Sequence, residues 1–332
     1  MTIVLTLLGF LAGLLVVGLA GSWLTTLAIK RKVESLLPPK GRMVEVPGAR
    51  LHVRESGEGP AILMIHGLGG QLSHFTFGVA AQLAGRFRVV AVDRPGSGWS
   101  TALAGADLST QAAALAALIE RLALGRPLVV GHSLGGAVAL ALALEHPDKV
   151  AGLALLAPLT HMPEGDRVPE VFKGLMIRSA ALRKLLAWTL ATPRSIGKSA
   201  ATLEQVFGPD PVPKDYGMRG AGLLSLRPSA YLAASDDLQA LPARLPAQQQ
   251  RYDTLRLPLG ILFGRDDRIL DWRANGQALA AKVAGARLEL IAGGHMLPVT
   301  HPDASASFIA AMAQASGLVN AAGSGQAASG AR

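Results

Sequence analysis

The chain of 332 residues contains no cysteine, and only 17% of its residues are charged and 5% aromatic. Without cysteine there is no disulfide, no cysteine nucleophile and no metal site built on thiolates. The low charge, combined with a hydrophobic fraction of 50%, excludes an intrinsically disordered chain. A chain of this length forms one large domain or two smaller ones with a sizeable core.

Acidic residues are scarce relative to basic ones, 23 against 32, which gives a formal net charge of +9. The excess lies in two segments: residues 1–43 carry five basic side chains and one acidic, and residues 167–256 carry thirteen basic and seven acidic. Neither segment has a basic run interleaved with aromatics, an RNA-binding motif or a zinc-finger spacing. We therefore expect no nucleic-acid partner.

The N-terminal segment explains the first basic cluster. Residues 1–29 hold no charged side chain, and a membrane-spanning helix needs roughly 20 such residues. Lys30, Arg31 and Lys32 follow at once, where cations reach lipid phosphates. We predict a transmembrane anchor over 1–29 and a basic juxtamembrane linker over 30–41, with membrane lipids as partners. The alternative is a signal peptide cleaved after Gly18-Leu19-Ala20, although the segment lacks a basic n-region and its apolar run is unusually long.

The charges flanking the apolar segment all follow it. The positive-inside rule then favours a single-pass protein of the cell membrane with a cytoplasmic C-terminal part, while the short uncharged N-terminus is itself compatible with translocation. Gly9 and Gly13 have the GxxxG spacing that pairs membrane helices. An oligomer formed through the N-terminal helix is one hypothesis, and a chance spacing in a glycine-rich segment is the other.

Strands alternate with helices through much of the remaining sequence. Residues 42–46 and 50–55 alternate in polarity around Pro47-Gly48, which predicts a hairpin. Helical patterns include residues 108–122, with Asp107 as N-cap, and 134–144. Uniformly apolar runs, which suit parallel strands buried on both faces, occur at 61–65, 89–92, 128–130, 152–156, 259–263 and 288–291. The alternation predicts an α/β fold with right-handed crossovers.

One long interval breaks this rhythm. Residues 160–257 contain several prolines, helical patterns and the second basic cluster, and we interpret them as an inserted, mostly helical cap. The core is then formed by residues 42–159 and 258–314. Residues 315–332 consist largely of Ala, Gly and Ser, which predicts a flexible tail.

A nucleophile motif follows one of the predicted strands. Gly131-His132-Ser133-Leu134-Gly135 matches G-x-S-x-G directly after the run 128–130 and before a helix. In such a strand–turn–helix, glycines two residues on either side of the serine avoid clashes in a strained turn that raises the serine oxygen above the sheet. The helix N-terminus also stabilises nearby negative charge. The motif makes Ser133 the candidate nucleophile.

A serine nucleophile needs a base and a carboxylate that orients the base. In a fold with this motif the acid and then the histidine come after later strands. Asp266 and Asp267 both follow the run 259–263, and either can serve as the acid. His295 follows the run 288–291 within a glycine turn, and no other histidine has that position.

The third requirement is an oxyanion hole. The glycine-rich stretch from His66 to Gly70 follows the first parallel run, and its glycines let the backbone approach a bound ester. The backbone N–H groups of Leu68 and Leu134 are the expected donors, one from each loop. We expect His66 to fix this loop through hydrogen bonds.

With these motifs in order, residues 42–313 resemble serine hydrolases of the α/β-hydrolase superfamily. The resemblance rests on His66-Gly67, Asp93–Ser100, Gly131–Gly136, Gly264–Asp267 and Gly294-His295. It implies a mostly parallel eight-stranded sheet flanked by helices, with a cap inserted after the sixth strand. It also supports Ser133, Asp267 and His295 as a catalytic triad, and it implies a structural role for the loop Asp93–Ser100.

The site residues restrict the chemistry further. A serine at position 133 argues against the epoxide hydrolases and haloalkane dehalogenases of this superfamily, which use aspartate. No strand is followed by a dinucleotide-binding G-x-G-x-x-G, and no His and carboxylate cluster has metal-ligand spacing, so we expect neither cofactor nor metal. The expected reaction is acyl transfer from an ester to water.

The substrate class is inferred from location. An anchor and a basic cap rich in Leu and Ala place the active site beside lipid, as in the membrane-anchored bacterial esterases and phospholipase A or lysophospholipase enzymes that this arrangement resembles. We therefore expect a carboxylesterase or lipase acting on lipid-like esters. The alternatives are a carboxylesterase for small soluble esters, a cofactor-free haloperoxidase, a C–C bond hydrolase using the same triad, and a ligand receptor without activity.

Overall fold

The computed structural model describes residues 1–162 and 170–319. Their strands form a single eight-stranded sheet in the order β1-β2-β4-β3-β5-β6-β7-β8. The β1–β2 and β2–β4 pairs are antiparallel and the other pairs are parallel. The strands are β1 (Arg42–Val46), β2 (Ala49–Ser56), β3 (Ala61–Ile65), β4 (Arg88–Val92), β5 (Leu128–His132), β6 (Gly152–Leu156), β7 (Leu259–Gly264) and β8 (Arg287–Ile291). The predicted mostly parallel sheet is confirmed.

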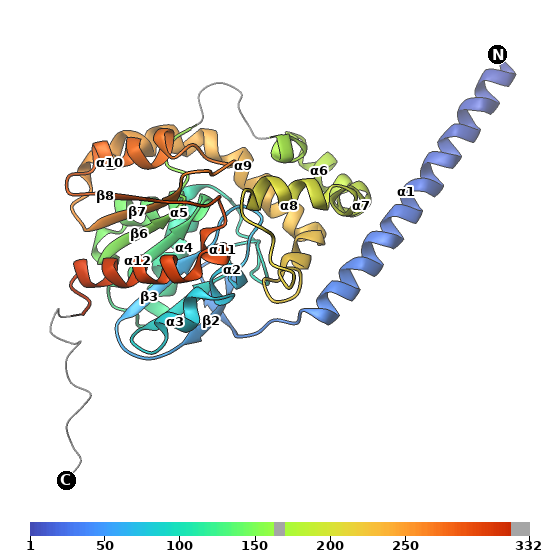
Figure 1. The fold of residues 1–332 in the computed structure, drawn as a ribbon. Helices are drawn as coiled ribbons and strands as arrows, with labels where there is room; N and C mark the ends of the chain where they lie inside the picture. The colour runs from blue at the N-terminus through green and yellow to red at the C-terminus, as the bar shows by residue number, and fades with distance from the viewer. Residues whose placement is uncertain (163–169, 320–332) are drawn as a thin grey trace, which may run out of the picture.

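Helices cover both faces of this sheet (Figure 1). Successive residues of a strand point to opposite faces, and in β3 the side chains of Leu63 and Ile65 belong to one core cluster, while those of Ile62 and Met64 belong to the other. The first cluster is completed by α4 (Leu108–Arg121), α5 (Leu134–Glu145) and α10 (Ala278–Lys282). The second is completed by α2 (Ser73–Thr76), α3 (Val79–Leu83), α11 (Leu297–Thr300) and α12 (Pro302–Ala315). Outside the cap, the same part of the chain also contains two short helical elements, η1 (Pro147–Lys149) and η6 (Arg273–Gln277).

Of two local predictions, the N-cap of α4 is confirmed and the burial of the last strand is wrong. The Asp107 side chain caps α4 by accepting hydrogen bonds from the N–H groups of Ser109 and Thr110, as predicted. By contrast, β8 is not buried on both faces, because it lies at the edge of the sheet and its residues are exposed or half-buried. Its apolar residues are only partly covered: Leu288 and Leu290 pack against one core cluster and Ile291 against the other.

Between β6 and β7 the described chain forms helices joined by loops and contains no strand. Residues 163–169 of the predicted cap lie outside the described residues, as do residues 320–332 of the predicted tail. The elements are η2 (Glu170–Leu175), α6 (Ala180–Leu186), η3 (Ala187–Ala191), α7 (Thr192–Gly197), α8 (Ser199–Phe207), η4 (Gly222–Leu226), α9 (Pro228–Gln248) and η5 (Gln249–Thr254).

The N-terminal segment forms one helix, α1 (Thr2–Leu36), of 35 residues. Its most apolar window has a mean hydropathy of 2.7 and is not buried, so the helix is long and apolar enough to cross a membrane. The first residues of the predicted linker at 30–41 continue the helix. Lys30 and Glu34 pair at 2.7 Å one turn apart, and the helix ends just before Pro38-Pro39, which disfavour helical backbone.

The last turns of α1 pack against the cap, whereas its N-terminal end projects from the rest of the molecule (Figure 1). The Ser22 hydroxyl donates to the carbonyl of Thr189 in η3. Val33 is buried in a small cluster with Ala221 and Leu224 beside η4. The charge-free part of the helix therefore ends at the level of the cap.

Candidate active site

Ser133 occupies the single residue between β5 and α5. Its φ of 54° lies in the left-handed region, which is the strained turn that the motif predicts. Side chains at the two glycines of the motif would collide with backbone: a Cβ at Gly135 would overlap the carbonyl oxygen of Ile65, and one at Gly131 that of Gly135. The motif therefore holds the serine at the carboxyl end of the sheet.

The loops after β7 and β8 bring an acid to a histidine. The Oδ2 atom of Asp267 lies 2.7 Å from Nδ1 of His295, and the Asp267 side chain is fully buried. Its other oxygen accepts the backbone N–H groups of Ile269 at 2.7 Å and Leu270 at 3.0 Å. Asp266, the competing candidate, is exposed. Of the two aspartates, the geometry pairs Asp267 with His295.

Two backbone donors meet beside Ser133. Among the residues that the structure describes, neither the Leu68 nor the Leu134 N–H donates a hydrogen bond to protein. The Leu68 loop lies against the nucleophile, since a Cβ placed on Gly67 would be 2.8 Å from the Cβ of Ser133. Two N–H groups without a protein partner near a serine are what stabilisation of a negatively charged oxygen requires.

These groups line one large cavity. It has a volume of about 800 Å³ and is bounded by Ser133, His295, Leu68 and Leu134 from the core. The cap supplies most of the remaining wall, and the apolar part of that wall includes Leu175, Met176, Leu203, Val206, Leu238 and Leu241. Asp267 lies behind His295 and outside the cavity lining. The cavity thus joins reactive groups from the core to an apolar surface from the cap.

Three further histidines around the cavity are held neutral. Burial lowers the pKa of His132 well below its usual range, and the positive charge on His295 would add to this effect. Burial likewise lowers the pKa of His66 well below its usual range and that of His74 to about 4. His66 shares hydrogen bonds with the Gly67 carbonyl at 2.8 Å and with the Arg94 N–H at 2.9 Å, as expected for a residue that fixes the loop.

Sequence reasoning missed the cap residues that contact the core loops. Asp210 accepts the N–H of Gly294 at 2.9 Å and lies 3.1 Å from Nε2 of His301, so it braces the loop that carries His295. Tyr216 shares a hydrogen bond of 3.1 Å with His74 on the cavity wall. No local pattern marks these residues, because their partners are distant in sequence.

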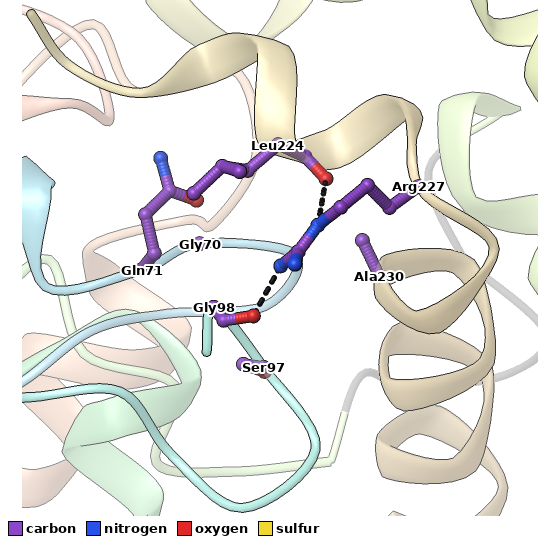
Figure 2. A pocket seen from close by; sticks show the side chains of 8 residues that line it. Gly70, Gln71, Ser97, Gly98, Leu224, Arg227 and Ala230 are labelled. Carbon is purple, nitrogen blue, oxygen red and sulfur yellow. Dashed lines mark hydrogen bonds between the residues drawn. The ribbon is translucent and has the colours of Figure 1, made fainter. Parts of the chain in front are cut away.

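A small crevice beside the cavity is filled by Arg227. Figure 2 shows its guanidinium directed at the carbonyl oxygens of Leu224 and Gly98, next to Gly70 and Ser97. Arg227 also lies 3.6 Å from Glu34 of α1 and 4.7 Å from the Trp99 ring centroid. The crevice is thus a junction between α1, the cap and the core, and its polar groups are already used.

Among the described residues, no group of three or more His, Asp or Glu side chains is arranged to hold a metal ion.

A serine at a strained strand–helix turn, with a histidine and an aspartate on later loops of a mostly parallel sheet, is the arrangement of an alpha/beta hydrolase. The family model described as the alpha/beta hydrolase fold matches residues 60–302, and the chain belongs to this family.

Known proteins of several activities are similar to the chain. A pimeloyl-(acyl-carrier protein) methyl ester esterase of Chromobacterium violaceum is 34% identical over 256 residues, which cover 76% of this chain and 87% of that protein. A 2-hydroxy-6-oxononadienedioate/2-hydroxy-6-oxononatrienedioate hydrolase of Burkholderia vietnamiensis is 27% identical over 67% of this chain and 76% of that protein.

Among solved structures, a membrane phospholipase A described as a bacterial virulence factor matches with a TM-score of 0.66 at 23% identity. The match covers 95% of this chain and 98% of that one. At this identity the likeness shows the fold alone.

Proposed function

We propose that the protein is a serine carboxylic-ester hydrolase with Ser133 as nucleophile, His295 as general base and acid, and Asp267 as the residue that orients His295. The observation that carries the proposal is the 2.7 Å contact between Asp267 and His295, on a cavity that both His295 and Ser133 line. The esterase among the relatives supports the same class of reaction.

The proposed mechanism uses these residues in turn. Because Asp267 accepts the proton on Nδ1, the lone pair of His295 is on Nε2, where it can take the Ser133 proton as Oγ attacks the ester carbonyl. The N–H groups of Leu68 and Leu134 stabilise the oxyanion of the tetrahedral intermediate. His295 then protonates the departing alcohol, and a water activated by His295 hydrolyses the acyl-enzyme.

We further propose that the substrates are lipid-like esters drawn from a membrane to which α1 anchors the enzyme. The cavity is largely apolar on its cap side and its volume of about 800 Å³ suits a sizeable acyl group. In the cap, Leu182, Leu185, Leu190 and Ile196 are 44%, 49%, 48% and 45% exposed, and Ile196 also lines the cavity. Such exposed apolar side chains beside the end of an apolar helix favour contact with lipid.

Small soluble esters and C–C bonds are the alternative substrates. The relative that hydrolyses 2-hydroxy-6-oxononadienedioate is the specific reason to retain the second alternative. Both alternatives use the same triad, so the difference lies in what the cavity accepts.

Steady-state assays on the detergent-solubilised full chain test the proposal. We expect hydrolysis of p-nitrophenyl esters and of phospholipid or monoacylglycerol, with higher kcat/KM for longer acyl chains, and loss of all turnover in Ser133→Ala. Turnover by Ser133→Ala equal to wild type would refute the mechanism. Activity confined to acetate and butyrate esters, or to a dienoate, would refute the lipid substrate and leave the nucleophile in place.

A further inference from the structure

A buried charged cluster lies behind the oxyanion loop and outside the cavity lining. Arg94 of the loop Asp93–Ser100 is fully buried, and Asp237 of cap helix α9 has a side chain only 4% exposed. The guanidinium and carboxylate make two contacts, of 2.8 Å and 3.1 Å, which is the bidentate geometry of a strong ion pair. The amide of Gln111 contacts both partners, accepting from Arg94 at 2.8 Å and donating to Asp237 at 2.9 Å.

The other donors of the same guanidinium hold the backbone next to Ser133. Arg94 Nε donates to the carbonyl oxygen of His66 at 2.9 Å, and Nη2 donates to that of Gly67 at 3.0 Å. The His66 ring adds to this restraint: since its Nε2 accepts the Arg94 N–H, its proton is on Nδ1 and is donated to the Gly67 carbonyl at 2.8 Å.

The Gly67 carbonyl and the Leu68 N–H belong to one peptide group. A peptide unit is planar and trans, so its N–H points opposite to its carbonyl. Fixing the Gly67 carbonyl on Arg94 and His66 therefore directs the Leu68 N–H away from that cluster and toward the cavity, where Gly67 abuts Ser133. The orientation of one oxyanion donor is thus set by hydrogen bonds made on its other side.

We propose that Asp237 is a positioning residue through which the cap aligns the oxyanion hole: it holds Arg94, and Arg94 holds the peptide that presents the Leu68 N–H. The inference rests on the proposed function, because it assigns Asp237 a part in the same reaction. In this arrangement the docking of α9 on the core completes the catalytic geometry as well as enclosing the substrate.

The test compares two neighbouring substitutions on one helix. Asp237→Asn keeps the shape but removes the carboxylate that fixes the guanidinium. Asp236→Asn is the matched control, since Asp236 pairs with Arg183 within the cap at 2.7 Å and is half-exposed. The assay uses the full-length enzyme and a soluble chromogenic ester. We expect Asp237→Asn to lower kcat by at least about tenfold. The loss should be smaller than the ~10²–10³ that follows removal of a whole oxyanion donor. We expect KM to change by less than about twofold, because Asp237 does not line the cavity.

A second readout separates alignment from general destabilisation. A trifluoromethyl ketone adds to the serine to give a tetrahedral oxyanion, and its inhibition constant should rise in Asp237→Asn in parallel with the fall in kcat/KM. In Asp236→Asn both values should match wild type. If Asp237→Asn does not fold, Arg94→Lys gives the same comparison, because it keeps a cation opposite Asp237 without the fork that holds two carbonyls.

The outcomes are distinct from those that test the proposed function. If Ser133→Ala is inactive but Asp237→Asn, or Arg94→Lys in its place, has the kcat and ketone affinity of Asp236→Asn, the positioning role is overturned and the hydrolase mechanism stands. If Ser133→Ala retains activity, the proposed function itself fails.

Discussion

At the scale of the residue, Ser133 has a strained backbone conformation, and buried histidines with lowered pKa values lie near it. A non-glycine residue at a φ of 54° costs of the order of 1–3 kcal/mol, and the strain persists because β5 and α5 fix the turn from both sides. The second acid candidate, Asp266, lies one residue from Asp267 but is exposed, so the pair provides a test of assignment within a single loop.

We predict that Asp267→Asn lowers kcat by about 10³–10⁴, because an amide can no longer hold His295 in the tautomer that accepts the serine proton. Asp266→Asn should remain within about twofold of wild type in the same assay. The measurement is kcat on a p-nitrophenyl ester for both variants. The reverse order of effects would assign the acid to Asp266.

The buried histidines make stability depend on pH. The folded protein lowers the pKa of His74 to about 4, whereas an unfolded histidine titrates near 6.5. Between these values the unfolded chain binds the proton and the folded chain does not, so stability is full above about pH 6.5 and falls toward pH 4, by up to ~1.4 kcal/mol per pH unit for each such group. His66 and His132 act in the same direction.

We therefore expect the Tm to fall as the pH is lowered from 6.5 to 4.5, and His74→Gln to reduce the slope of that fall. Thermal unfolding followed by circular dichroism at several pH values gives the measurement. Parallel Tm curves for wild type and His74→Gln would contradict a neutral, buried His74.

At the scale of the element, the strands and helices of the core could be predicted from local sequence more completely than the contacts of the cap. The central strands are short apolar runs because both of their faces are covered, and α4 starts where Asp107 caps it. Ser133 and Asp267 come within three residues of the end of such a strand and His295 comes within four residues of the end of β8, so the candidate site could be located by position in the sequence. The edge strand β8 is the exception, since its outer side has no neighbouring strand.

The cap contacts could not be found in this way. Asp237 and Arg94 are 143 residues apart, and each reads as an ordinary charged residue in its own segment. Which carboxylate meets which guanidinium depends on how α9 docks on the core, and that is decided by packing between distant segments. The same holds for Asp210 and Gly294.

The β5–α5 turn gives a prediction for an element. Gly135→Ala would place a methyl group against the carbonyl oxygens of Ile65 and His66, so we expect a loss of about 1–3 kcal/mol in unfolding free energy, together with reduced activity. Gly85→Ala is the control, because nothing lies near its Cβ and stability should change by less than about 1 kcal/mol. Urea unfolding of both variants provides the comparison, and equal stabilities would show that the turn is looser than described.

At the scale of the whole molecule, α1 has two parts: an exposed, apolar N-terminal part and a C-terminal part that contacts the cap. The first part is uncovered, and the part from Ser22 onward contacts η3 and η4. Basic residues follow the apolar segment directly. This division predicts that the first part can be removed without unfolding the hydrolase.

We predict that the full chain sediments with membranes and resists carbonate extraction, while a variant that lacks residues 2–21 is soluble. The shortened enzyme should keep its kcat on p-nitrophenyl butyrate within about threefold and lose most of its activity on phospholipid in vesicles, because anchoring raises the local lipid concentration. An intact mass that lacks the first 20 residues would instead identify a cleaved signal peptide. Equal activity of both forms on vesicles would remove the proposed role of the anchor.

The central claim is that Ser133 is the activated nucleophile of an ester hydrolase. The most direct measurement is labelling of the native full-length protein with a fluorophosphonate, followed by peptide mass spectrometry. We predict a single adduct on Ser133, formed at least about a hundredfold more slowly in His295→Ala, where no base takes the serine proton. The absence of an adduct, or an adduct on another residue, would contradict the account.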